Sequence, residues 1–397
     1  MADSTESALL TTSDSIRRLL DEGQGAVLVL LDLSVEFDTF SPQIMVSRLY
    51  QAGIRDSALK ILESFLGNRP ITVSWADFKA PAFCLPCGVP QASALSPTLF
   101  NVYVAPLAKL IRSYGFTPTS YADDTQLIIP VSRNNWEEVA DQFCNCMRDI
   151  NRWMGQNWLK LNTNKTKIVL CGFSNEVWNS RWWPSECGKL PSPSIATKNL
   201  EVIFDNCLCF RPQVNAMVKS SYWILKTLRK ILTYLQQEER VAVILALVMS
   251  RLDYCNSLLL DLDKMSLSKL QLIQNNAARL ILDLPLLASA SYSLKRLHWL
   301  PVGKWIIFKT LCLTFKAVHG GGADYLAARL RWYCPRRELR SKNAYLIHVC
   351  RTRKVRWGDK AFTVAAAKHW NSLPWDIRKE ENFLTFRRLV KTWLFPR

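Results

Sequence analysis

The chain has 397 residues, of which 49% are hydrophobic and 21% are charged, so two or three globular domains are expected and disordered or collagen-like classes are excluded. Its 51 basic and 33 acidic side chains leave a net charge of +18, which favours an anionic partner. Residues 331–397 carry +12 and five tryptophans, a mixture that suits phosphate contacts and base stacking, although a solvated basic face would have the same composition.

The N-terminus does not have the pattern of an export signal. Asp3 and Glu6 stand where a secretory signal would carry basic residues. The longest apolar runs are at most about half the length of a membrane-spanning helix. We therefore expect an intracellular protein, in the nucleus or the cytoplasm, that does not bind a membrane.

The first predicted elements are a helix and a buried strand. Residues 7–22 have leucine and isoleucine at helical spacing and precede Gly23, which predicts an amphipathic helix. Residues 26–33 are an apolar run typical of a strand buried on both faces, and Asp32 interrupts it. A buried aspartate is costly unless it is paired or binds a cation. The elements predicted next are helices at 43–66, broken at Gly53, a short strand at 71–73 and a helix at 94–115.

Two adjacent carboxylates, Asp123 and Asp124, lie within residues 119–129, whose strand-like flanks predict a β-hairpin with an acidic tip. Adjacent aspartates at a turn are also common as solvated turn formers. After a helix at 136–158, a short strand and a linker at 175–195, the pattern becomes mostly helical. The later predicted helices span residues 212–235, 239–258, 264–282, 302–318, 357–370 and 383–394.

The three carboxylates suggest one site if Asp32 and the Asp123–Asp124 hairpin lie side by side on a central sheet. Hard oxygen ligands are what Mg²⁺ requires. Two such ions can activate an attacking oxygen and stabilise a leaving one, as in polymerases. An acidic front domain that holds cations and a basic remainder that holds a polyanion would then act together.

Several motifs, in order and with matching spacing, resemble the reverse transcriptase of jockey-like non-LTR retrotransposons, the long interspersed elements. The front motifs are LDLSVEFD at 31–38, GVPQASALSPTLFNVY at 88–103, YADD at 121–124 and WLKLNTNKT at 158–166. The C-terminal motifs are LHWLPV at 297–302, LTFKAVHG at 313–320 and HWNSLPWDIR at 369–378. The resemblance covers essentially the whole chain.

The resemblance implies a role for individual residues. Asp32, Asp123 and Asp124 would be catalytic and would bind Mg²⁺, with Mn²⁺ as a possible substitute, and Lys165 would neutralise or protonate the pyrophosphate leaving group. The nucleotide-binding residues would be Phe37, which excludes a 2′-hydroxyl, Gln91, Ser93 and Tyr121. The primer-binding residues would be Asn199, Leu200 and Val202. A core phenylalanine, a helix cap and a surface lysine are the structural alternatives for Phe37, the Gln91–Ser93 loop and Lys165.

The chain departs from the family pattern at a few positions. Val35 and Glu36 replace small residues, Ala92 replaces a glycine that allows close backbone approach, and Glu201 replaces another glycine. The chain also begins close to the first catalytic strand, so we expect an N-terminally truncated family member without an endonuclease and with its fingers largely missing.

The predicted fold class is α+β. Residues 1–205 would form a polymerase palm with a small antiparallel sheet, packed helices and a remnant of the fingers. Residues 206–290 would form a helical thumb, and 291–397 a basic, tryptophan-rich and mostly helical domain. The predicted function is RNA-directed DNA polymerase, with an RNA template, a DNA primer or target and deoxynucleoside triphosphates as partners. The alternative is a catalytically inactive, retroelement-derived nucleic-acid-binding remnant, and the oligomeric state stays open.

Overall fold

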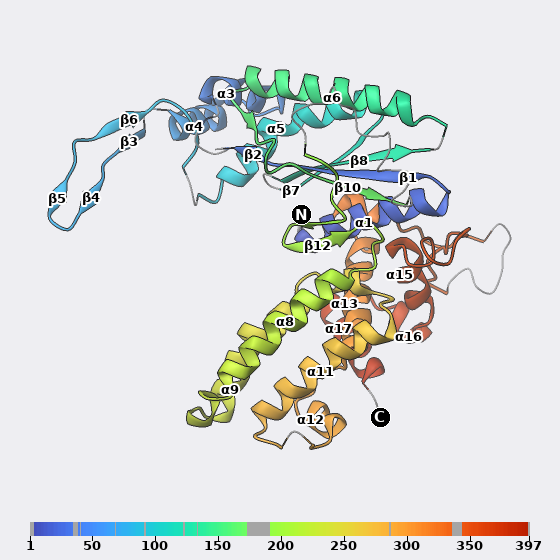
Figure 1. Cartoon of the computed structure of the whole chain (residues 1–397). Coiled ribbons are helices and arrows are strands. Elements are labelled where there is room, and N and C mark those ends of the chain that lie inside the picture. Colours follow the sequence, from blue (N-terminus) through green and yellow to red (C-terminus); the bar gives the residue numbers. More distant parts are fainter. Residues whose placement is uncertain are drawn as a thin grey trace. The chain divides into compact units, whose positions relative to one another are not determined.

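The computed structural model describes residues 4–34, 39, 41–67, 69–90, 93–121, 124–132, 134–172, 191–285, 287–335 and 344–395. The chain divides into two compact units (Figure 1). Gln24–Ser194 forms one, called here the sheet unit, and Met1–Gly23 together with Ile195–Arg397 forms the other, called the helical unit. The segment predicted as the palm thus contributes to both units, and the division into three domains stays a prediction.

The sheet unit is built on a four-stranded antiparallel sheet with the strand order β10-β1-β8-β7. Its strands are β1 (Gly25–Leu31), β7 (Thr117–Tyr121), β8 (Asp124–Val131) and β10 (Lys167–Cys171). Residues on both faces of β1 are buried, as its unbroken apolar run predicts. The predicted hairpin is confirmed, because Tyr121 pairs with Asp124 at the end where β7 and β8 meet.

Helices α5 (Ser96–Ser113) and α6 (Trp136–Gln156) cover one face of this sheet (Figure 1). Val27, Val29 and Leu31 of β1 share a buried core with Phe100 of α5 and Phe143 of α6. Helices α3 (Pro42–Gln51) and α4 (Asp56–Leu66) lie beside α5. The predicted break between them is confirmed at the turn containing Gly53, whose φ of +96° a glycine adopts without strain.

A long hairpin projects from the sheet unit (Figure 1). It consists of β3 (Arg69–Ile71), β4 (Ser74–Trp75), β5 (Phe78–Lys79) and β6 (Phe83–Leu85). The strand predicted at 71–73 overlaps β3 only at Ile71, and the other three strands were not predicted. The strands are two or three residues long, too short for a period of two to stand out in the sequence. Trp75 and Phe78 at the tip are 82% and 67% exposed.

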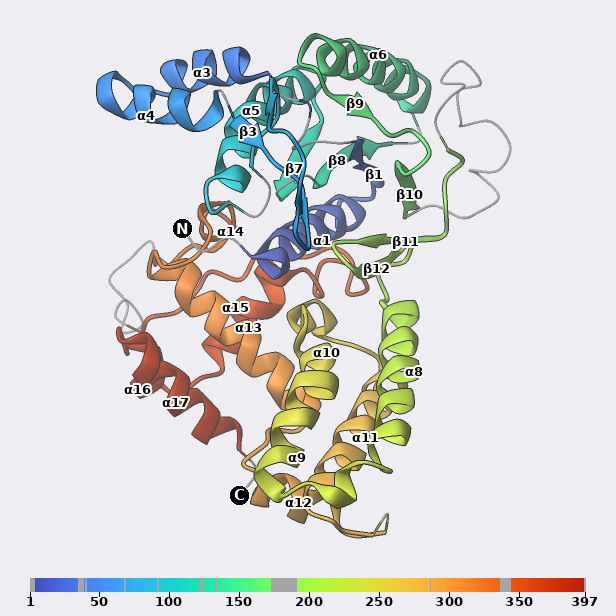
Figure 2. The ribbon, with the colours of Figure 1, turned by 90° about the vertical axis from the view of Figure 1, so that its left-hand side faces the viewer.

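The helical unit contains the hairpin β11 (Ala196–Asn199) and β12 (Val202–Asp205), followed by helices that pack side by side (Figure 2). The segments between β12 and residue 300 are α8 (Arg211–Leu228), η2 (Leu232–Tyr234), α9 (Gln237–Ile244), η3 (Leu245–Met249), α10 (Ser250–Asp253), η4 (Asn256–Leu259), α11 (Lys264–Ile281) and α12 (Ala290–Arg296). Three predicted helices cover α8, α9 to η4, and α11, so the helical character of this stretch is confirmed.

The C-terminal helices pack around a cluster of aromatic rings. The helices are α13 (Val302–Val318), α14 (Asp324–Ala327), α15 (Phe362–Asn371), α16 (Trp375–Arg378) and α17 (Phe383–Leu394). Trp370 is fully buried and stacks on Phe386, with their ring centroids 5.4 Å apart. The ring centroid of Phe315 lies 4.4 Å from that of Phe386 in the same cluster. Trp370 therefore belongs to the core, whereas Trp375 and Trp393 are exposed.

The first helix, α1 (Thr5–Asp21), belongs to the helical unit. It is buried almost all round instead of on one amphipathic face, because its polar side chains have partners in the same unit. Asp14 is fully buried, forms an ion pair with Arg329 at 2.7 Å, and accepts hydrogen bonds from the backbone N–H and the hydroxyl of Thr363. Glu6 pairs with Lys309 at 3.0 Å. No helix in the described ranges is both long and apolar enough to cross a membrane.

Candidate active site

The sheet unit brings two of the predicted metal ligands to the same end of neighbouring strands. In the antiparallel pair β1 and β8, Leu31 lies opposite Thr125. Asp32 directly follows β1 and Asp124 is the first residue of β8, so the two residues lie at the same end of these neighbouring strands. Their binding of a common cation stays a prediction.

The Asp32 carboxylate is partly buried and incompletely satisfied. Its side chain is 34% exposed, but its Oδ1 atom is buried and has no hydrogen-bond partner among the described residues. Lys165 Nζ lies 3.8 Å from this oxygen, which is ion-pair distance but beyond hydrogen-bond distance. The Lys165 side chain is 69% exposed. A buried carboxylate oxygen without a donor is a site that a cation or a proton would satisfy.

A short ladder and a turn hold Lys165 next to Asp32. Strand β2 (Leu33–Ser34) pairs with β9 (Lys160–Leu161). In the turn after β9, the Asn162 N–H donates to the backbone oxygen of Asp32 at 2.9 Å. The buried Thr166 hydroxyl donates to the Asn162 backbone oxygen at 2.9 Å, and the Lys165 N–H donates to Asn162 Oδ1 at 3.3 Å. The motif at 158–166 thus forms a turn that places an ammonium group beside Asp32.

The loop before α5 is fixed by side chains that bind its backbone. Ser93 Oγ accepts a hydrogen bond from the Leu95 N–H at 3.2 Å, and Ser96 Oγ donates to the backbone oxygen of Pro90 at 2.6 Å. Arg69 donates to the backbone oxygens of Cys87 and of Gly88, the latter at 2.9 Å. Ser93 therefore makes a local turn at the start of the helix, and its role toward the nucleotide stays a prediction.

One network of the sheet unit was missed in the sequence. Tyr103, fully buried on α5, donates to the backbone oxygen of Asn157 at 2.8 Å and accepts from the Ser41 N–H at 3.2 Å. The Arg48 guanidinium lies 4.4 Å from the Tyr103 ring and donates to Asn157 Oδ1. Burial lowers the pKa of Arg48 and raises the pKa of the Tyr103 phenol. The network ties α3, α5 and the segment before β9 together, and the only signal was a tyrosine at the end of a family motif.

Several predicted residues lie outside the described residues. They are Phe37, Gln91 and Asp123, together with the unusual positions Val35, Glu36 and Ala92. Tyr121 is half-buried at the end of β7, next to the two residues that connect it to Asp124. The roles of these residues stay predictions.

The predicted primer-binding residues lie in the helical unit, on the hairpin β11–β12. Asn199 and Val202 pair across the hairpin and are 3% and 2% exposed. Leu200 and Glu201 form its turn, both with positive φ, and the Leu200 backbone oxygen accepts from the Tyr254 hydroxyl at 2.9 Å. The Asn199 and Val202 side chains thus face the interior of the unit, and the roles of all three residues in primer binding stay predictions.

The donor atoms near Asp32 fit a hard divalent cation. Asp32 and Asp124 supply carboxylate oxygens, and the buried Oδ1 of Asp32 has no hydrogen bond in the described part of the chain. No group of three histidine, cysteine, aspartate or glutamate residues suited to a metal occurs within the described ranges, which do not include Asp123. Oxygen donors of this kind prefer Mg²⁺ or Mn²⁺ to softer metals.

A sheet with carboxylates at one end and a lysine beside them is the kind of site in which metal-assisted phosphoryl transfer takes place. The model of the reverse transcriptase (RNA-dependent DNA polymerase) family matches residues 3–213, more than half of the chain. The chain belongs to this family.

Two other comparisons place the chain among known proteins. The probable RNA-directed DNA polymerase from transposon BS of Drosophila melanogaster is 26% identical over 280 residues, which cover 68% of this chain and 30% of that protein. This chain thus spans less than a third of that relative's length.

A telomerase from Candida albicans, solved with the TWJ fragment of telomeric RNA, is 14% identical to this chain, with a TM-score of 0.32. The match covers 78% of this chain and 52% of the telomerase chain. The predicted resemblance to a retrotransposon reverse transcriptase is confirmed by the family and by the transposon relative.

Proposed function

We propose that this chain is an RNA-directed DNA polymerase of a non-LTR retrotransposon, which adds deoxynucleotides to the 3′-hydroxyl of a DNA primer. The observation that carries the proposal is the position of Asp32. It lies at the end of β1 where β8 begins with Asp124, and its buried Oδ1 lies 3.8 Å from Lys165 Nζ. Family membership and the transposon relative support the same activity.

In this proposal Asp32, Asp123 and Asp124 would hold Mg²⁺ or Mn²⁺, which, when bound, stabilises charge on the attacking and leaving oxygens. The primer 3′-oxygen forms a bond to the α-phosphorus while the bond to pyrophosphate breaks. Lys165, held beside Asp32 by the Asn162 turn, neutralises or protonates the pyrophosphate.

The remaining residues of the proposed site select and position the substrates. Phe37 leaves no room for a 2′-hydroxyl, and Gln91, Ser93 and Tyr121 contact the nucleotide and the template. The hairpin of Asn199, Leu200 and Val202 supports the primer end. The helices from Arg211 to Ile281 act as a thumb, and the basic residues 331–397 hold RNA or DNA. The net charge of +18 supports nucleic acid as the partner.

The test is primer extension on an RNA template with Mg²⁺ and the purified chain. We expect Asp32→Asn to abolish extension, because an amide is a poor ligand for the cation. Lys165→Gln should slow extension by about 10²–10⁴-fold, the usual contribution of one general acid. The matched controls are Asp141→Asn and Lys109→Gln, which change exposed helical residues of the same unit and should extend normally.

Absence of extension by the unchanged chain would contradict the proposal, provided that the chain is folded. If that chain still binds RNA or DNA in a salt-dependent way, and Asp32→Asn does not alter the binding, the protein is a nucleic-acid-binding remnant whose carboxylates no longer act.

A further inference from the structure

A polar cavity of about 380 Å³ lies within the helical unit, and none of the residues that line it belongs to the sheet unit. The cationic side chains that line it are Arg17, Arg211, Arg356 and Lys360. Asp261 and Asp263 line it as well. We propose that this cavity binds a phosphate group, supplied by the backbone of a bound nucleic acid.

Arg17 is the buried part of the cavity wall. It is 4% exposed, and its hydrogen bonds go to neutral oxygens, the backbone oxygen of Leu208 at 2.8 Å and Ser13 Oγ at 3.3 Å. Burial lowers the pKa of Arg17 to about 10, against the opposing effect of the nearby Asp261, so the guanidinium stays charged at neutral pH. The carboxylates of Asp261, Asp205 and Asp14 offset part of the cost of burying this cation, although its hydrogen bonds go to neutral oxygens. An anion in the cavity would offset more of that cost.

The cavity has more positive than negative charge. Arg211 is matched by Asp263, with Nε 3.1 Å from Oδ2. Lys360 donates at 2.9 Å to the backbone oxygen of Asp261, which is neutral. The guanidinium carbon of Arg356 lies 4.7 Å from the ring centroid of Trp357, which is a neutral partner. Among the described residues, Arg17, Arg356 and Lys360 are therefore balanced by the lining carboxylate of Asp261 and the nearby carboxylate of Asp205, and the surplus of one positive charge suits a phosphate.

The loop that lines the cavity before α8 is fixed by a carboxylate. Asp205 accepts hydrogen bonds from the N–H groups of Cys207, Cys209 and Phe210. These backbone donors are therefore occupied, and the part of the wall that they belong to is held in place before a ligand arrives. The cations of the lining are the groups left to bind an anion.

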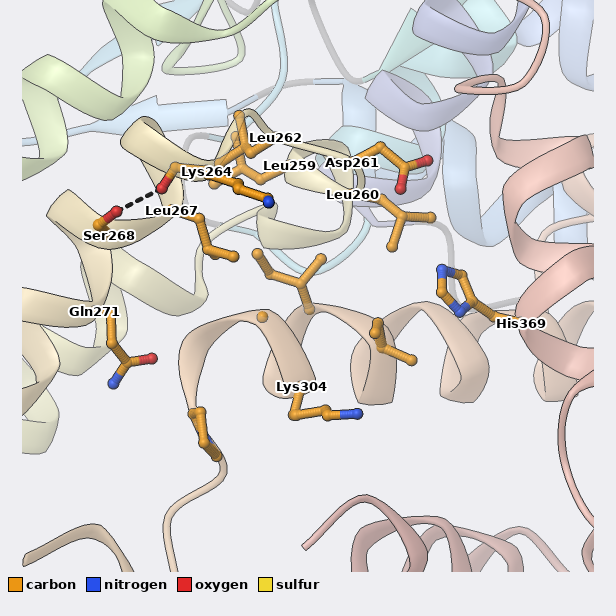
Figure 3. A pocket seen from close by; sticks show the side chains of 14 residues that line it. Leu259, Leu260, Asp261, Leu262, Lys264, Leu267, Ser268, Gln271, Lys304 and His369 are labelled. Carbon is orange, nitrogen blue, oxygen red and sulfur yellow. Dashed lines mark hydrogen bonds between the residues drawn. The ribbon is translucent and has the colours of Figure 1, made fainter. Parts of the chain in front are cut away.

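An adjoining cavity of about 550 Å³ has a different lining from that of the cationic cavity (Figure 3). It shares Leu260, Asp261 and Leu262 with the cationic cavity. Its whole lining is mainly apolar, with four leucines, two isoleucines and Pro301, and its cations are Lys264 and Lys304. Such a lining does not desolvate an anion favourably, so the phosphate is assigned to the cationic cavity alone.

The test separates a phosphate that belongs to nucleic acid from free phosphate. The thermal unfolding midpoint is measured in inorganic phosphate and in chloride of equal ionic strength, without divalent cations. In parallel, the affinity for a 16-base-pair RNA–DNA hybrid is measured over a range of salt concentrations. The double variant Arg356→Gln with Lys360→Gln removes two cations from the cavity. Arg356→Lys keeps the charge of the cavity. The control is the double variant Lys109→Gln with Arg112→Gln, which removes two cations from α5 of the sheet unit.

We expect phosphate to raise the midpoint of the unchanged chain, of Arg356→Lys and of the control, but not of the double glutamine variant. If the ligand is the nucleic-acid backbone, the slope of log K against log salt for the hybrid also falls by about 1 in that variant. Loss of the phosphate effect with an unchanged slope would keep the phosphate site but overturn its assignment to nucleic acid. A phosphate effect that is absent, or equal in the double variant and the control, would overturn the site.

The source of the phosphate rests on the proposed function, but the phosphate measurement does not. It needs no template, primer or divalent cation, so it can succeed when primer extension fails. Conversely, a chain that extends primers but has no phosphate effect would keep the proposed activity and lose this site.

Discussion

The turn between β11 and β12 places two residues with side chains in the left-handed region, Leu200 at φ 44° and Glu201 at φ 63°. A side chain there costs roughly 1–2 kcal/mol, which a glycine avoids. The sequence showed Glu201 in place of a family glycine, and the structure gives that substitution a physical cost. An exposed ion pair between Lys198 and Glu201 at 3.1 Å offsets little of it.

We therefore expect Glu201→Gly to raise the free energy of unfolding by about 0.5–1 kcal/mol, the relief of backbone strain less the extra entropy of the unfolded glycine. Urea unfolding followed by circular dichroism measures the change. Glu201→Ala is the matched control, because it removes the ion pair but keeps a Cβ in the strained conformation. A gain of equal size in Glu201→Ala would show that the strain is not the cause.

Asp14 is a second residue whose surroundings define its contribution. Its carboxylate is fully buried and is shared between Arg329 and Thr363. Removing one partner of a buried pair leaves the other charge uncompensated, so Asp14→Ala should destabilise the chain by about 3–5 kcal/mol. The control is Asp376→Ala, which breaks an exposed pair with Lys379 and should cost about 0–1 kcal/mol in the same unfolding experiment. Equal losses would contradict the burial argument.

Among elements, α11 depends on one carboxylate at its start. Asp263 caps the helix by accepting from the Ser266 N–H at 2.9 Å, and it pairs with Arg211. These contacts, the hydrogen bond from Ser266 first, lower the pKa of Asp263 from 3.8 to about 2. When folding lowers the pKa of a carboxylate, the ionised carboxylate stabilises the folded protein at any pH above the pKa of the unfolded state. This contribution is lost as the pH falls through the pKa of the folded state.

The stabilisation by Asp263 should therefore be complete above pH 3.8 and disappear as the pH falls toward about 2. Asp263→Asn keeps a capping side chain but does not titrate, so its unfolding free energy should fall less over this interval than that of the unchanged chain. Asp283→Asn, at an exposed position, is the control and should follow the unchanged chain. A parallel acid dependence in Asp263→Asn would refute the assignment.

The elements also show what the sequence could predict. The ranges 302–318 and 383–394 match α13 and α17 to the residue, because a helix of this length repeats its apolar period several times. The strands β4, β5 and β6 were missed because each is defined by its partner across a hairpin and not by its own pattern. The position of Asp32 and Asp124 at the same end of β1 and β8 agrees with the motif order, whereas the Arg48, Tyr103 and Asn157 network depends on packing between helices distant in sequence.

At the scale of the whole molecule, α1 is separated in sequence from the unit to which it belongs. Asp14 reaches Arg329, Glu6 reaches Lys309, and the Asp21 carboxylate accepts from the N–H groups of Arg353 and Lys354. Leu9 and Ile16 are fully buried. No local pattern in the sequence could reveal these partners, which is why the helix was predicted to be merely amphipathic.

We expect residues 195–397 to fold cooperatively only when residues 4–23 are supplied, because without α1 the half-buried Arg329 loses the carboxylate of Asp14 and Lys309 keeps, among the described residues, only that of Asp253. Thermal unfolding of the fragment with and without a synthetic peptide of residues 4–23 measures this. A peptide carrying Asp14→Ala and Glu6→Ala is the control and should not restore the transition. A sharp transition in the fragment alone would show that α1 is dispensable.

The same arrangement sets an order of events during synthesis. Helix α1 leaves the ribosome well before its partners, because Lys309, Arg329 and Thr363 are made some 300 residues later, which at about 5–20 residues per second is a wait of tens of seconds. During this wait, the sheet unit can complete its own core while Leu9, Ile16 and Leu20 have no permanent cover. Nascent chains should therefore bind chaperones through α1 until the helices that carry its partners emerge.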